Sequence, residues 1–337
     1  MERPRPPPHG NGPVSVNTFS GPLLAVDVEV ERRAFAVGAS FELEQGERLA
    51  LFGASGAGKT TILESIAGLT PLRRGTVRVD GVLVAGRTRD ETALPARYRQ
   101  VALVRQPTTL FPHLTAGQNV RYGARGASTS AIAELVDRLG IGPLVHQAAA
   151  ALSGGQRQRV ALGRALASRF RVLLLDEPFS AVDVGARGGL RDVTIEVTTH
   201  SGAAAILVTH DLTEAQRFGG RLGIIDEGRI LVIGEPRPLV TGPSCRRVAE
   251  LVGYAGFAPA PNGAWYAIHP DRVLPGVVAG AGLILTGKVL SVHAFGPRYD
   301  CELAVGAGMR LSVHLDEPPL VGAECTVTAV APPIVAS

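Results

Sequence analysis

The stretch Gly53-Ala-Ser-Gly-Ala-Gly-Lys59-Thr60 decides the fold of this chain. It matches the pattern GxxxxGK[ST], with an apolar strand-like run at 48–52 before it and an amphipathic helical pattern after it. Glycines let a backbone wrap a phosphate and turn its N–H groups inward, and the N-terminus of the following helix adds a favourable dipole. Strand, loop and helix together predict a phosphate-binding α/β domain and not an ordinary glycine-rich turn.

The residue types in this loop fit a nucleotide with its metal ion. Lys59 would supply positive charge to the β- and γ-phosphates, and Thr60 offers a hydroxyl to Mg²⁺, which prefers oxygen ligands. The predicted nucleotide-binding residues of the loop are Gly53, Ala54, Ser55, Gly56, Ala57, Gly58, Lys59, Thr60 and Thr61.

A second apolar run, Val172-Leu-Leu-Leu175, ends in Asp176 and Glu177. It predicts a buried strand that presents two carboxylates at its C-terminal edge, where ligands bind in open α/β sheets. We expect Asp176 to hold Mg²⁺ through water and Glu177 to orient and polarise an attacking water. An apolar run followed by two acids is common by itself, so this prediction depends on the phosphate loop.

A second glycine-containing loop, Leu152-Ser153-Gly154-Gly155-Gln156, opens another helical pattern. Its serine hydroxyl and free amides predict another anion-binding helix N-terminus. Two such loops grip one nucleotide from both sides only if they face each other.

At this point the sequence resembles the ABC ATPase family, over roughly residues 22–245. LSGGQ is similar to the family's signature loop, Ser180-Ala-Val-Asp183 to its D-loop and Thr209-His210-Asp211 to its H-loop. Gln106 resembles the glutamine that links Mg²⁺ and water to a transmembrane partner. The resemblance implies catalytic roles for Glu177, His210 and Gln106 and metal-binding roles for Thr60, Gln106 and Asp176. It further implies an ATP site that is completed by Ser153, Gly154, Gly155 and Gln156 of the opposite subunit.

The family's aromatic residue that stacks on adenine has no clear counterpart here. Phe35 is the one aromatic candidate, its placement is late, and it could equally be a core residue. Arg32 or Arg33 could stack on the base instead.

The chain divides into four predicted segments: a disordered leader at 1–20, an ATPase domain with a helical subdomain at 21–245, a linker at 246–264 and an all-β domain at 265–337. In the ATPase domain, 205–208 predicts a second buried strand, 223–233 a hairpin, and Ser130–Leu139 a helix capped by Ser130 and Gly140. Four short strands between 288 and 330 predict a small OB-like barrel.

Composition excludes some classes of function. The formal charge of +4 is spread along the chain, so it predicts a solvated surface and no nucleic-acid partner. Three dispersed cysteines indicate neither a metal site nor a disulfide framework, and no segment has the roughly 18 apolar residues of a membrane span. The N-terminal segment lacks the apolar core of a signal peptide, and the missing spans exclude an exporter with a fused membrane domain.

Two stretches favour an importer within the family. Phe111-Pro-His-Leu114 resembles molybdate and ferric-iron importers, where its apolar residues either meet a permease or pack internally. Ala267-Ile-His-Pro-Asp-Arg272 resembles the start of the TOBE/MOP module, a barrel that dimerises, regulates or binds oxyanion.

The resemblance implies an ATPase homodimer that uses ATP and Mg²⁺ at the cytoplasmic face of the membrane. Its partners would be permease subunits and, through them, an extracytoplasmic solute-binding protein. Molybdate is the favoured solute, with sulfate, ferric iron, polyamine or sugar as alternatives. A soluble ABC ATPase without a transport role and a binding protein with a decayed ATPase are the competing hypotheses.

Overall fold

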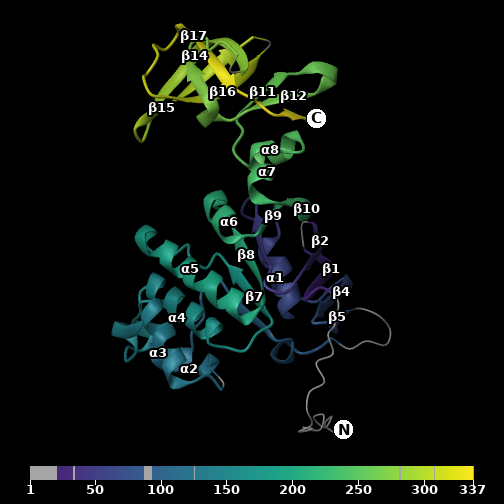
Figure 1. Ribbon diagram of the computed structural model, residues 1–337, viewed down its shortest axis with the longest axis vertical. Helices are drawn as coiled ribbons and strands as arrows, with labels where there is room; N and C mark the ends of the chain where they lie inside the picture. The colour runs from purple at the N-terminus through teal and green to yellow at the C-terminus, as the bar shows by residue number, and fades with distance from the viewer. Residues whose placement is uncertain are drawn as a thin grey trace.

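A ten-stranded mixed sheet forms the centre of the N-terminal part of the molecule (Figure 1). The computed structural model describes residues 21–32, 35–86, 93–124, 126–280, 282–306 and 308–336. The predicted leader at 1–20 and Arg33 therefore lie outside the described residues. The strands of the sheet are β1 (Leu24–Glu31), β2 (Ala36–Leu43), β3 (Arg48–Phe52), β4 (Arg74–Val79), β5 (Val82–Gly86), β6 (Val101–Val104), β7 (Val172–Asp176), β8 (Ala204–Thr209), β9 (Arg221–Asp226) and β10 (Arg229–Gly234).

The sheet order is β5-β4-β1-β2-β10-β9-β3-β8-β7-β6. Strands β9, β3, β8, β7 and β6 run parallel, whereas β1, β2, β4 and β5 pair antiparallel. Because β3, β7 and β8 are neighbours and parallel, their carboxyl ends meet at one edge of the sheet. The predicted buried strands at 172–175 and 205–208 and the predicted hairpin at 223–233 are confirmed as β7, β8 and β9–β10.

Helices cover both faces of the parallel strands. Alternate residues of β7 belong to different cores: Val172 and Leu174 pack in the cluster that contains α1, and Leu173 and Leu175 pack in the cluster beneath α4 and α5. The helices are α1 (Lys59–Ala67), α2 (Ala116–Gly123), α3 (Thr129–Arg138), α4 (Gly154–Leu166), α5 (Val184–Ser201), α6 (Leu212–Phe218), α7 (Pro236–Thr241) and α8 (Arg246–Leu251). Helices α2 and α3 lie with α4 at the end of the molecule far from the C-terminal part, as the predicted helical subdomain requires (Figure 1). No helix among the described residues is long and apolar enough to cross a membrane.

The start of α3 corrects one prediction. Ser128, and not Ser130, caps this helix, and its hydroxyl accepts a hydrogen bond from the Ala131 N–H at 3.2 Å. Ser130 lies in the first turn, where its hydroxyl is 3.0 Å from that of Ser128. Gly140 follows the helix in the left-handed region, as expected.

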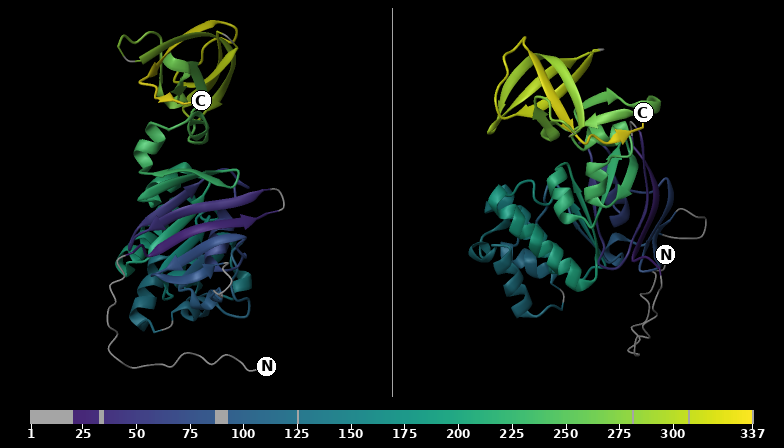
Figure 2. Two further views of the ribbon diagram at one scale, coloured as in Figure 1. Left: turned by 90° about the vertical axis from the view of Figure 1, so that its right-hand side faces the viewer. Right: turned by 45° about the horizontal axis from the view of Figure 1, so that its top comes forward.

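The C-terminal part consists of two antiparallel sheets, of order β13-β17-β14-β15-β16 and β11-β12-β18. Figure 2 shows the larger sheet curled on itself, as predicted for a small OB-like domain. Its strands, with those of the smaller sheet, are β11 (Gly256–Pro259), β12 (Trp265–Ile268), β13 (Val273–Pro275), β14 (Gly282–Phe295), β15 (Arg298–Val305), β16 (Met309–Leu315), β17 (Glu324–Val330) and β18 (Ile334–Val335).

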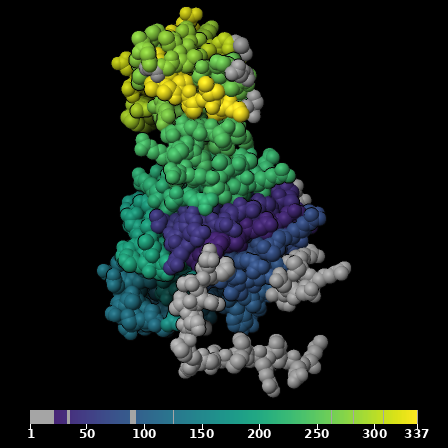
Figure 3. Space-filling view, turned by 45° about the vertical axis from the view of Figure 1, so that its right-hand side comes forward, coloured from purple at the N-terminus to yellow at the C-terminus, as the bar shows by residue number. Residues whose placement is uncertain are grey.

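The segment 246–264, expected to be a linker, has regular structure. It contains α8 and β11, and β11 pairs with β12 along its whole length. Val248 and Ala249 of α8 are buried in a cluster that also contains Phe52 of β3 and Leu222 of β9. The C-terminal sheets therefore rest on the ten-stranded sheet through a packed layer that includes α7 and α8 (Figure 3).

Candidate nucleotide site

The phosphate loop joins β3 to α1, as the motif predicts. Lys59 is the first residue of α1, and its side chain is buried beneath the loop. Its Nζ donates hydrogen bonds to the carbonyl oxygens of Gly53 at 2.8 Å and Ala54 at 2.9 Å. Burial lowers the pKa of Lys59, and the carboxylates of Glu177 and Asp176 oppose that shift. The ammonium group thus lies inside the loop, close to two acids.

Thr60 and Asp176 meet at the carboxyl edge of the sheet. The Thr60 hydroxyl lies 3.0 Å from each carboxylate oxygen of Asp176, which ends β7 and is 4 % exposed. Burial raises the pKa of Asp176, and the hydrogen bond from Thr60 opposes the shift. A hydroxyl and a carboxylate side by side form a hard oxygen donor set of the kind that Mg²⁺ prefers.

Glu177 and His210 form the second polar pair. Glu177 directly follows β7 with φ 45°, and its N–H donates to the Val208 carbonyl oxygen at 2.9 Å. His210 directly follows β8, and its Nδ1 lies 2.8 Å from Glu177 Oε1. The unusual backbone conformation of Glu177 is therefore fixed by a neighbouring strand while its carboxylate faces His210.

Gln106 reaches the same edge from the end of β6. Its Nε2 donates to the Ser180 hydroxyl at 3.2 Å, and that hydroxyl donates to the Glu177 carbonyl oxygen at 2.9 Å. A chain of hydrogen bonds thus joins the predicted catalytic glutamine to the backbone of the predicted base.

These groups surround one cavity of about 630 Å³. Most of the predicted loop and edge residues line it, and His210 adjoins it through Glu177. Two further side chains, Arg32 and Phe35, also line the cavity, and Arg32 Nε donates to Thr61 Oγ1 at 2.8 Å. The predicted residues that line the cavity are Ser55, Gly56, Gly58, Lys59, Thr60, Thr61, Gln106, Asp176 and Glu177.

The signature loop lies elsewhere in the same chain. Ser153 caps α4, and its hydroxyl and the Gln156 side chain each bond the other residue's backbone N–H. Gly155 packs on the backbone at Ala181, because a Cβ at Gly155 would lie 2.7 Å from the Ala181 carbonyl oxygen. None of the residues 153–156 lines the cavity around Lys59.

One residue that supports the site escaped the sequence analysis. Gly228, in the β9–β10 turn, donates its N–H to the Ala57 carbonyl oxygen of the phosphate loop at 3.0 Å and accepts from the Gly38 N–H at 2.8 Å. Its φ is +81°, and a Cβ there would lie 2.6 Å from the Ala36 carbonyl oxygen. The turn itself is predicted from the sequence, but its contact with Ala57, 171 residues earlier, leaves no local signal.

Comparison with known proteins agrees with this geometry. The family model described as "ABC transporter" matches residues 37–180. A "Fe(3+) ions import ATP-binding protein FbpC 3" of Rhodococcus jostii is 42 % identical over 241 residues, which cover 71 % of this chain and 68 % of the relative. The chain belongs to the ABC transporter family of ATP-binding proteins.

Other members of the ABC transporter family match the same part of the chain. A "Fe(3+) ions import ATP-binding protein FbpC" of Mesorhizobium japonicum is 39 % identical over 241 residues, covering 70 % of this chain and 66 % of the relative. The chain thus spans about two thirds of the length of these relatives. A solved structure titled "Structure of ATP binding subunit of ABC transporter" superposes with a TM-score of 0.57 at 28 % identity, covering 68 % of this chain and 95 % of that one.

Proposed function

We propose that this chain is the ATP-hydrolysing subunit of an ABC importer, bound peripherally at the cytoplasmic face of a membrane. The observation that carries the proposal is the convergence of Lys59, Thr60, Asp176 and Glu177 on one cavity at the carboxyl edge of the sheet. The alternative of a decayed, non-hydrolysing family member is disfavoured, because each of these groups is present and in contact with a partner.

The residues act on ATP in separate ways. The loop amides and Lys59 bind the β- and γ-phosphates, and Glu177 accepts a hydrogen bond from the attacking water and orients it. His210, whose Nδ1 lies 2.8 Å from Glu177 Oε1, would contact the γ-phosphate. Thr60, Asp176 and Gln106 would hold Mg²⁺, which supplies charge neutralisation on the phosphates when bound.

Hydrolysis also requires a second chain. Ser153–Gln156 of the same chain do not line the cavity around Lys59, which opens to solvent. We infer that two chains pair head to tail, so that the helix N-terminus of α4 in one chain closes the cavity of the other. ATP would then favour the closed dimer, and loss of the γ-phosphate would reopen it.

A single substitution tests the hydrolytic role. Glu177→Gln keeps the size of the side chain and removes its negative charge, so ATP binding is expected to persist while turnover falls by about 10²–10³-fold. Turnover is measured as phosphate release by the chain assembled with its permease. A normal rate for this variant would show that Glu177 does not orient the water.

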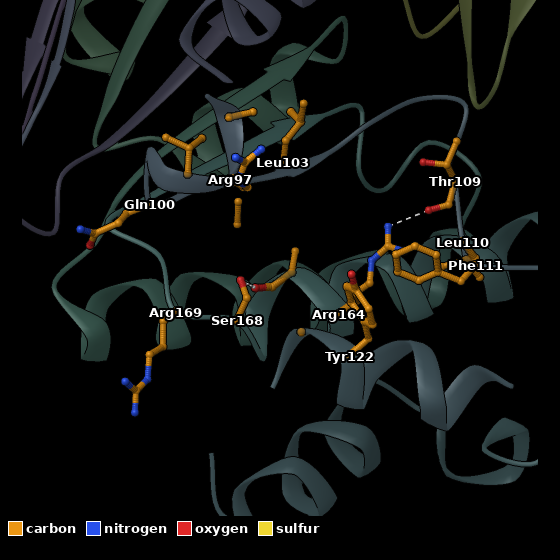
Figure 4. A pocket seen from close by; sticks show the side chains of 15 residues that line it. Arg97, Gln100, Leu103, Thr109, Leu110, Phe111, Tyr122, Arg164, Ser168 and Arg169 are labelled. Carbon is orange, nitrogen blue, oxygen red and sulfur yellow. Dashed lines mark hydrogen bonds between the residues drawn. The ribbon is translucent and has the colours of Figure 1, made fainter. Parts of the chain in front are cut away.

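The permease partner is expected to dock in a groove of about 760 Å³ between β6 and the helical subdomain (Figure 4). Phe111 and Tyr122 meet there with ring centroids 4.4 Å apart, and Arg164 lies 5.2 Å from the centre of the Phe111 ring. Arg97 and Arg169 also line the groove. Aromatic rings with three arginines fit a short permease helix that carries apolar and acidic residues. Of the two alternatives for these apolar residues, the position of Phe111 in the groove favours contact with the permease over internal packing. Leu114 does not line this groove.

Docking is tested with the assembled complex. Phe111→Ala and Arg164→Gln, made together, are expected to reduce co-purification of the permease without changing ATP affinity. An unchanged yield of permease would place the docking surface elsewhere.

We propose ferric iron as the transported solute. The support is that both relatives described above are named for Fe(3+) import. This replaces the expectation of molybdate with one of its alternatives, because the relatives described above are named for Fe(3+) import. Cells that carry the permease with Lys59→Ala in this chain should lose energy-dependent uptake of labelled ferric iron and keep uptake of labelled molybdate. Loss of molybdate uptake alone would reverse the assignment, and loss of neither would favour a role outside transport.

A further inference from the structure

Three aromatic side chains line one cavity outside the ATPase site. Aromatic residues make up only 5 % of the sequence, and there is a single tryptophan. That tryptophan, Trp265, lines a cavity of about 580 Å³ together with Tyr254, Phe257 and Met309. The volume falls within the roughly 300–1,000 Å³ that small-molecule sites span.

The cavity lies where the helices that follow the ATPase domain meet the C-terminal sheets. Its walls come from α8, β11, β12 and the start of β16. Trp265 and Phe257 pack against the same buried cluster as Phe52, the residue that precedes the phosphate loop. A molecule in this cavity would therefore touch α8 and the C-terminal sheets, and two of the side chains around it pack against a cluster shared with the ATPase sheet.

Two arginines give the cavity its charge. The Arg246 guanidinium lies 4.7 Å from the centre of the Phe257 ring and 5.3 Å from that of Trp265. Arg310 lines the same cavity, is largely exposed and pairs with Glu302 at 3.0 Å. The single acid in the lining is Glu250, so the lining carries one net positive charge.

Among the described residues, the hydrogen bonds of Arg246 leave its two terminal nitrogens free to bind a ligand. Its Nε donates to Glu250 Oε1 at 3.1 Å, and the other oxygen of Glu250 accepts from Arg247 at 3.3 Å. Within the described part of the chain, the two terminal nitrogens of Arg246 and the indole N–H of Trp265 have no hydrogen-bond acceptor. The planar fork of a guanidinium held over two rings is the geometry that binds a carboxylate with two parallel hydrogen bonds.

We propose that this cavity is a binding site for an aromatic monocarboxylate. The carboxylate pairs with the terminal nitrogens of Arg246, and its single negative charge balances the net charge of the lining. The ring of the ligand packs among Trp265, Tyr254 and Met309, where aromatic and thioether groups favour a flat apolar partner.

The single tryptophan makes the test direct, because all indole emission of the full chain comes from Trp265. Benzoate, the probe, is expected to change that emission saturably at millimolar concentration or below. Benzamide, which has the ring without the charge, and acetate, which has the charge without the ring, are expected to produce no saturable change.

Substitutions then locate the site. Arg246→Gln is expected to weaken benzoate binding by about tenfold or more. The matched control is Arg237→Gln, because Arg237 is exposed and does not line the cavity, and the affinity of this variant for benzoate should match that of the unaltered chain. The Arg246→Lys variant keeps the positive charge over the rings but lacks the planar guanidinium, so we expect it to bind benzoate with intermediate affinity. This variant tests the site even if the glutamine variant folds poorly.

Three results would overturn the proposal. The first is the absence of a saturable change with benzoate. The second is an equal response to benzamide or acetate, which would remove the requirement for an aromatic anion. The third is equal benzoate affinity in the Arg246→Lys, Arg246→Gln and unaltered chains.

Discussion

Arg99 anchors the end of helix α1 that lies opposite the phosphate loop, and we predict that Arg99→Met loosens this helix. Arg99 is 5 % exposed. Its Nε donates to the Leu94 carbonyl oxygen at 2.8 Å, and its Nη1 donates to those of Ser65 at 3.2 Å and Ile66 at 2.9 Å. Two of these carbonyls belong to the last turn of α1, where a helix carries partial negative charge.

The loss in the free energy of unfolding that we expect for Arg99→Met follows from these three hydrogen bonds. Hydrogen bonds to charged groups stabilise a fold by about 1.5–3 kcal/mol each. Burial opposes part of this gain, and the same burial lowers the pKa of Arg99. Methionine fills the space but removes all three hydrogen bonds, although the Ser65 carbonyl oxygen still accepts from the Gly68 N–H at 3.2 Å, so we expect a net loss of about 3 kcal/mol. At an unfolding entropy of about 2.1 cal/mol/K per residue, that loss lowers the unfolding midpoint of a 337-residue chain by roughly 4 °C.

Thermal unfolding of the purified chain, followed by circular dichroism, measures this effect. The control is Arg97→Met, because Arg97 is exposed and its guanidinium lies over the Tyr98 ring, 4.6 Å from its centre. The control should change stability by no more than about 0.5 kcal/mol. If the Arg99 variant unfolds at the same temperature as the Arg97 variant, the three hydrogen bonds do not stabilise α1 and the reasoning fails.

Two further predictions concern the site itself. Asp176→Asn should abolish hydrolysis and raise the unfolding midpoint at neutral pH without nucleotide, because the raised pKa of Asp176 means that its ionised form destabilises the fold. This gain should shrink as the pH falls through the raised pKa toward the ordinary value of 3.8, and a lower midpoint at neutral pH would contradict it. Gly228→Ala should displace the turn from Ala57 and weaken ATP binding by about tenfold, equivalent to about 1.4 kcal/mol. Gly185→Ala, at a site with open space, should bind ATP normally, and equal affinities would show that the turn does not support the loop.

Local patterns in the sequence predict the parts of the fold that depend on interactions between residues close together in the chain. The phosphate loop, the buried run at 172–175 and the Glu227-Gly228 turn each carry their signal within a few residues, and the structure confirms them. The cap of α3 shows the limit of this approach. Ser128 and Ser130 are both good caps, and the sequence does not show which one begins the helix.

Contacts between distant segments leave no such signal. Helix α8 lies in a stretch that looks like a linker, and it forms because Val248 and Ala249 pack against strands of the ATPase sheet. Arg32 bonds Thr61, and Gly228 bonds Ala57, over 29 and 171 residues of chain respectively. The residue types at the nucleotide site are therefore readable from the sequence, whereas the groups that hold them in place are known only from the fold.

The central claim is that one chain supplies only half of each ATP site. The most direct measurement is the mass of the Glu177→Gln variant in solution with ATP and Mg²⁺, by analytical ultracentrifugation. We expect two chains of 35.1 kDa each to sediment together, and Ser153→Arg in the same background to bind ATP and sediment as one chain. If the Glu177→Gln variant binds ATP and remains a single chain, the signature loop does not complete a partner's site and the account is wrong.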